Sequence, residues 1–80
     1  MLRALEPTVR RYHINVFYSD EDRSWIADIP DLQFCSAFDA TAEQAVAEVE
    51  RARGLWLEAA RAEGRTFPAP VYRPAPAQAL

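Results

Sequence analysis

The residues of this sequence that could do chemistry are one cysteine, one histidine and a scatter of carboxylates. Cys35 stands midway between Asp31 and Asp39 in the stretch DLQFCSAFDATAEQA. A nucleophilic cysteine needs a base, and His13 is the only histidine. Nothing in the spacing brings the two together, and a cysteine in a strand is most often a small buried hydrophobic residue. We therefore predict no catalytic residues and no enzyme activity.

Metal and cofactor sites find equally little support. One cysteine and one histidine lack the paired spacing of a zinc site. Asp20, Glu21 and Asp22 lack the alternate acids and the glycine of a calcium loop, so they indicate a hairpin turn. Asp28 and Asp31 could form a carboxylate pair, but their neighbours favour a strand end and a turn. With two glycines in the chain there is no phosphate-binding loop, and we predict no metal or cofactor.

The strands that would carry these residues follow from the alternation of apolar side chains. Residues 12–18 alternate with period two, and so do residues 25–29. The polar segment SDEDRS (19–24) joins them as a hairpin. A turn at 29–32 then leads to a third short strand at 33–38. Tight connections between three strands predict an antiparallel meander.

A long helix should follow this meander. Thr41 and Gln44 have the spacing of a capping box, and Gly64 is a natural stop, so we expect a helix from about 42 to 63. Its apolar stripe consists of Ala42, Ala45, Val46, Val49, Ala52, Trp56, Ala59 and Ala60. Gly54 inside the helix is explained only by close packing. PVYR (70–73) could add a short edge strand, which gives an α+β fold of order β-β-β-α-β.

Eighty residues suit one domain. We divide the chain into a flexible lead-in (1–11), a single domain (12–73) and a Pro/Ala-rich tail (74–80). One cysteine excludes an internal disulfide framework and favours a reducing, cytoplasmic location. No apolar run is long enough to span a membrane, and no secretion signal is evident at the N-terminus.

The formal net charge of −3 conceals a strongly acidic middle segment. Residues 19–50 carry nine acids and one arginine, while both flanking segments are net positive. This pattern argues against nucleic acid as the main ligand, because phosphate binding needs clustered Lys and Arg. It favours a basic protein partner if the acids share a face. A solvated acidic surface that aids solubility is the open alternative.

Several motifs occur together in a characteristic order. They are an aromatic residue with IADIPDL at 25–32, the cysteine at 35, DATAEQA at 39–45, LWLEAARAEGR at 55–65 and FPAP at 67–70. In this order and spacing, the chain from Tyr12 to about Pro74 resembles the HicB family of type II toxin–antitoxin antitoxins. Two positions depart from the family pattern: Gln33-Phe34 stands where members often have Pro-Gly, and Phe38 where they usually have Gly.

The resemblance implies a partial RNase H-like domain of order β-β-β-α-β, with 70–73 as the fourth strand. Family members bind and inhibit HicA, a small basic ribonuclease toxin, by covering its active site. Many also carry a C-terminal DNA-binding domain, and members commonly self-associate. Here a Pro/Ala segment ends at residue 80 where that domain would begin, so we expect no direct DNA binding by this chain.

The leading hypothesis is therefore an antitoxin-type module that neutralises a HicA-like toxin and forms a homo-oligomer, either a dimer or a tetramer. The residues expected to contact the partner are Asp20, Glu21, Asp22, Trp25 and Asp28. The alternative is a stand-alone self-assembling domain of structural or regulatory role, without a toxin. A degenerate or metal-dependent nuclease is a third hypothesis.

Overall fold

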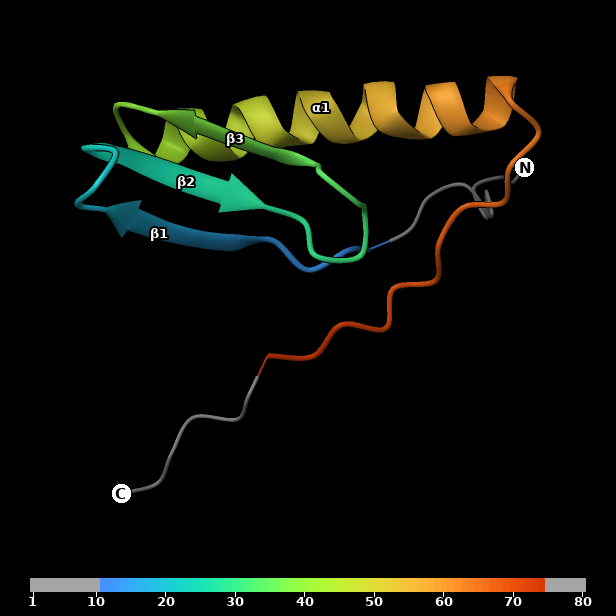
Figure 1. Ribbon diagram of the computed structural model, residues 1–80, viewed down its shortest axis with the longest axis horizontal. Helices are drawn as coiled ribbons and strands as arrows, with labels where there is room; N and C mark the ends of the chain where they lie inside the picture. Colours follow the sequence, from blue (N-terminus) through green and yellow to red (C-terminus); the bar gives the residue numbers. More distant parts are fainter. Residues whose placement is uncertain (1–10, 75–80) are drawn as a thin grey trace, which may run out of the picture.

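The computed structural model describes residues 11–74, so all but residue 11 of the expected lead-in (1–11) and all but residue 74 of the expected tail (74–80) lie outside the described residues. It has three strands and one helix (Figure 1): β1 (Asn15–Ser19), β2 (Ser24–Asp28), β3 (Ser36–Asp39) and α1 (Ala42–Ala62). The predicted α+β class is confirmed, with an antiparallel meander followed by one long helix. No helix in this described part is long and apolar enough to cross a membrane.

The sheet has the order β1-β2-β3, and α1 runs along one of its faces (Figure 1). Ala27 of β2 lies opposite Val16 of β1 and Ala37 of β3, and this row faces the helix. Because side chains alternate along a strand, the neighbouring row faces the other way. We call that side, which α1 does not cover, the open face.

The helix begins and ends as its sequence predicts. The backbone N–H of Gln44 donates to Thr41 Oγ1 at 3.1 Å, which confirms the expected N-cap. At the other end Gly64 has φ of 73°, and its N–H donates to the carbonyl of Arg61. The N–H of Arg65 reaches back to Ala60 at 2.9 Å, which completes a Schellman motif.

The core lies between α1, the sheet and the connection from β2 to β3. Its buried members are Tyr12, Ala27, Ile29, Leu32, Cys35, Ala45 and Val49. Of the predicted helical stripe, Ala45, Val49 and Ala60 are fully buried, whereas Ala59 is exposed. The helix packs mainly over β2 and β3, so it leaves the outer strand β1 half uncovered.

The β2–β3 connection consists of two successive turns rather than an early start of the third strand. Leu32 N–H donates to the carbonyl of Ile29, and Cys35 N–H donates to that of Leu32. The Ile29 N–H closes the loop on the carbonyl of Cys35 at 3.0 Å. This spacing of three buries all three side chains in the core. The predicted strand at 33–38 therefore begins only at Ser36.

The expected fourth strand at 70–73 is not formed in the described region, and this part of the fold prediction is wrong. The N–H groups of Val71 and Tyr72 donate instead to the Asp31 carboxylate, at 3.3 and 3.1 Å. Proline at position 70 has no N–H to donate. The segment is therefore tied to the β2–β3 connection by a side chain and does not join the sheet.

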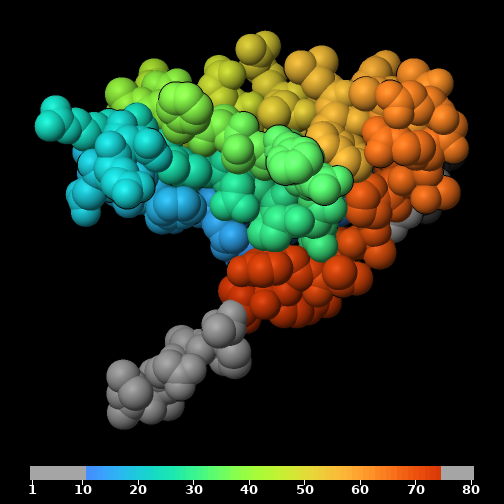
Figure 2. All heavy atoms as spheres, viewed as in Figure 1, coloured from blue at the N-terminus to red at the C-terminus, as the bar shows by residue number. Residues whose placement is uncertain are grey.

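The segment after the helix also packs against the residues that lead into β1. The hydroxyl of Tyr12 donates to the carbonyl of Pro68 at 2.6 Å, and the rings of His13 and Tyr72 lie 5.1 Å apart. The alternation of apolar residues predicted that the first strand begins at Tyr12. Because Tyr12 and His13 make these contacts with the C-terminal segment instead, β1 begins only at Asn15. In Figure 2 residues 67–74, drawn in red, lie against the green β2–β3 connection, and the blue and teal β1–β2 hairpin projects away from them.

Candidate protein-interaction surface

The three acids selected from the sequence lie together in the turn between β1 and β2. Asp20, Glu21 and Asp22 are all exposed. Ser19 Oγ donates to the Asp22 carboxylate at 3.0 Å and accepts from the Asp22 N–H at 3.2 Å. This local network gives Asp22 a structural role in the turn, as the hairpin interpretation requires. It also gathers three carboxylates at one end of the sheet.

The other two selected residues lie elsewhere. Trp25 faces the helix side, where its ring meets that of Tyr18 edge-on at 5.5 Å and packs against the core. Asp28 lies at the opposite end of β2, paired with Asn15 and Ser36 on the open face. The five residues chosen from the sequence therefore do not form one continuous surface.

The open face presents a different candidate, a row of apolar side chains across all three strands. Phe17 lies directly opposite Ile26, and Ile26 lies directly opposite Phe38. Phe17 is 48% exposed and Phe38 is 71% exposed. We call Phe17, Ile26 and Phe38 the aromatic row, after the two phenylalanines that flank Ile26. Large side chains exposed side by side on an uncovered sheet are typical of a protein-binding surface.

The aromatic row was within reach of sequence reasoning, although it was not selected. Period two alone places Phe17, Ile26 and Phe38 on the face away from Trp25 and Ala27. What the sequence lacks is the register, which decides whether the three side chains meet. A shift of one residue in the register would place all the side chains of that strand on the opposite face of the sheet.

Phe34 adds a further exposed aromatic residue, at a position of unusual backbone geometry. Its φ is 62°, in the left-handed region that favours glycine, and its side chain is 92% exposed. It is the third residue of the turn 32–35, the position at which a type II turn requires positive φ. This geometry explains why a Pro-Gly pair would suit positions 33 and 34. Trp56 Nε1 donates to the Gln33 carbonyl at 2.9 Å and holds this turn against the helix.

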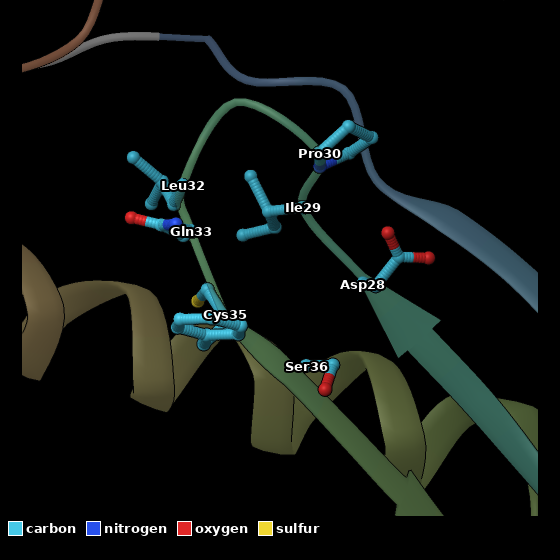
Figure 3. Close-up of a pocket in the computed structure, with 8 residues that line it drawn as sticks. Asp28, Ile29, Pro30, Leu32, Gln33, Cys35 and Ser36 are labelled. Atoms are coloured by element: carbon cyan, nitrogen blue, oxygen red, sulfur yellow. The ribbon is translucent and has the colours of Figure 1, made fainter.

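An open hollow of about 360 Å³ lies beside this turn, between the end of β2 and the start of β3 (Figure 3). Asp28, Pro30, Cys35 and Ser36 are among its lining residues. In Figure 3 the Asp28 carboxylate points away from Cys35, so the two do not form a reactive pair.

Cys35 itself is buried, and its burial raises the pKa of the thiol above the ordinary value of 9.0. The guanidinium of Arg53 opposes this rise, while the carboxylate of Asp28 adds to it. A raised pKa keeps the thiol protonated, which makes it a poor nucleophile. His13 is engaged elsewhere, since its Nε2 lies 2.8 Å from Asn15 Oδ1. Across residues 11–74, no three His, Cys, Asp or Glu side chains are grouped closely enough to hold a metal ion.

Comparison with protein-family models, with curated proteins and with solved structures found no match for this chain. Over residues 11–74 the chain forms a small α+β module in which one face of the sheet carries exposed apolar side chains and is not covered by α1.

Proposed function

We propose that this chain is an antitoxin-type interaction module that binds and neutralises a small basic HicA-like ribonuclease toxin. The observation that carries the proposal is the aromatic row on the open face, next to an acidic turn. The row supplies apolar area that a partner would bury. The acids at 20–22 would steer a basic partner towards it, which affects the association rate more than the affinity.

The family resemblance supports the same function independently of the surface. It extends over most of the chain and implies a partial RNase H-like domain, with which the β-β-β-α order is compatible. The proposed module acts in the cytoplasm by binding its partner, without catalysis of its own. The buried, protonated Cys35 supports the non-enzymatic character of the proposal.

Growth rescue tests this function directly. A HicA-like toxin encoded beside this chain would be expressed with and without it, and we expect co-expression to restore growth. Phe38→Ser should weaken the rescue because it removes exposed aromatic area from the open face.

Leu55→Ser is the matched control for this assay. Leu55 is 70% exposed, as Phe38 is, but it lies on α1 rather than on the open face. This variant should rescue like the wild type. Absence of rescue by the wild-type chain would refute the proposal, and equal loss in the two variants would refute the role of the open face.

A stand-alone self-assembling domain is the second candidate function. It is favoured by the exposed outer strand β1, which offers a surface for copies of the same chain. In that case the chain would assemble in the absence of a toxin and would not rescue growth.

A further inference from the structure

The outer strand β1 is an unusually unprotected sheet edge. In the part of the chain that the structure describes, Asn15–Ser19 pairs with β2 on one side and with no strand on the other. Edge strands are normally blunted by charged side chains, proline or a bulge. The sequence NVFYS has neither charge nor proline, and its three central side chains are 40–48% exposed. This edge can therefore accept another strand.

We propose that a second copy of this chain pairs antiparallel with β1 about a two-fold axis at Phe17, which joins the two sheets into one. This geometry places Phe17 opposite Phe17 of the other copy and Val16 opposite Tyr18. Asn15 then lies opposite Ser19. Apolar residues meet apolar residues and polar residues meet polar residues, so the strand is complementary to itself, as a two-fold interface requires.

The charges at the two ends of β1 favour the antiparallel arrangement. The acids at 20–22, which outnumber Arg23, follow the strand, whereas Arg11 precedes it. Antiparallel pairing sends the two acidic turns to opposite ends of the interface, where each would lie beside residues 12–14 of the other copy. Parallel pairing would bring the two acidic turns together, which is unfavourable.

The same pairing covers surface that α1 leaves exposed. The helix packs mainly over β2 and β3, so Val16 and Tyr18 remain 40% and 47% exposed on its side of the sheet. In the dimer, Val16 of each copy would pack against Tyr18 of the other copy. On the open face the two aromatic rows would continue into each other through Phe17. The dimer rests on self-assembly, the second candidate function, and specifies its strand, axis and register; it requires no toxin, so it can fail or hold independently of growth rescue.

Sedimentation velocity over a range of concentrations tests the dimer. The wild-type chain should sediment as twice its mass of 9.1 kDa. Val16→Lys places a charge in the new interface without altering the open face, and it should raise the dissociation constant at least roughly tenfold. Phe38→Lys changes the far edge strand and should remain a dimer. Far-UV circular dichroism verifies that both variants are folded.

A disulfide test reports the register. Across the two-fold axis the Cα atoms at position 17 would lie roughly 4.5–5.5 Å apart, within the range of a disulfide. Phe17→Cys should therefore form a covalent dimer on mild oxidation. The two copies of position 15 would lie about 13 Å apart, at about 3.3 Å per residue over four residues. Asn15→Cys should therefore not form a covalent dimer. Cys35 is buried and does not compete.

Three results would overturn the proposal. The first is a wild-type chain that stays monomeric at high micromolar concentration. The second is dissociation by Phe38→Lys to the same extent as by Val16→Lys, which would indicate contact through the open face. The third is a covalent dimer of Asn15→Cys in the same yield as that of Phe17→Cys, which would exclude the two-fold axis at Phe17.

Discussion

At the scale of single residues, Phe34 combines an unfavourable backbone conformation with an exposed side chain. Its backbone has φ of 62° and its ring is 92% exposed. A non-glycine residue held in the left-handed region costs on the order of 1 kcal/mol or more. An exposed ring offsets little of this cost through packing.

Phe34→Gly should therefore stabilise the chain. The expected gain is about 1 kcal/mol, or roughly 4–8 °C in Tm for a domain of this size, because glycine adopts positive φ without strain. Thermal unfolding followed by circular dichroism measures it. Gln33→Gly is the control, since Gln33 is the neighbouring position without positive φ and should gain nothing. A Tm for Phe34→Gly at or below that of Gln33→Gly would show that the turn is unstrained.

Cys35 provides a second residue-scale prediction, on pH dependence. Burial raises its pKa in the folded chain, so the unfolded chain ionises first as the pH rises. The stability that Cys35 contributes is fully present below the ordinary thiol pKa of 9.0 and is lost as the pH rises from there through the raised pKa. The difference in unfolding free energy between wild type and Cys35→Ala should shrink over that range. Chemical denaturation at a series of pH values measures it, and a constant difference would contradict buried ionisation.

At the scale of elements, local sequence rules predicted most of the fold, and tertiary contacts decided the remainder. Alternation identified three strands, and Thr41 and Gly64 marked the ends of the helix. The third strand was placed three residues too early, because the two turns at 29–35 are closed by core packing and not by turn residues alone. The prediction of a fourth strand was wrong because the N–H groups of Val71 and Tyr72 donate to the carboxylate of Asp31, some forty residues away.

The interaction surface was less predictable than the elements, for a related reason. Charge identified the acidic turn, but the expected contact residues also included Trp25, which packs half-buried against the core on the helix side. Phe17, Ile26 and Phe38 become neighbours only through strand register, which depends on how two connections close. Apolar residues on the exposed side of a sheet cannot be told from core residues by hydrophobicity alone.

Gly54 is an element-scale test of helix stability. Close packing was the sequence-based explanation, and it is wrong: a Cβ at this position would meet nothing within 4 Å. Gly54→Ala should therefore stabilise the chain by about 1 kcal/mol through helix propensity. Urea denaturation measures the gain. Loss of stability would mean that the helix needs flexibility at this point, and Ala47→Gly, at another exposed helical position, should show the opposite change.

Asp31 tests the attachment of the C-terminal segment to the β2–β3 connection. Asp31→Ala removes the acceptor for Val71 and Tyr72, so amide exchange at these two residues should accelerate roughly tenfold. Hydrogen exchange followed by NMR measures it residue by residue. Asp28→Ala is the matched control from the same loop region, and it should leave both amides unchanged. Equal rates in wild type and Asp31→Ala would show that other contacts hold the segment.

At the scale of the whole molecule, the helix divides the protein into a packed side and an open side. The core is small, and the open face carries aromatic side chains that contribute little to it. A domain of this size has a thin stability margin, so exposed aromatic surface is expected to be covered in the working state. We propose the open face as the surface that binds a basic toxin and the β1 edge as the surface that binds a second copy of the chain.

Calorimetric titration of the purified chain with a HicA-like toxin tests the central claim most directly. The account predicts binding that weakens with added salt, because the turn at 20–22 is acidic. It also predicts a Kd at least roughly tenfold higher for Phe38→Ser than for Leu55→Ser, whose affinity should equal that of the wild type. No binding by the wild-type chain, or equal affinity of the two variants, would contradict it.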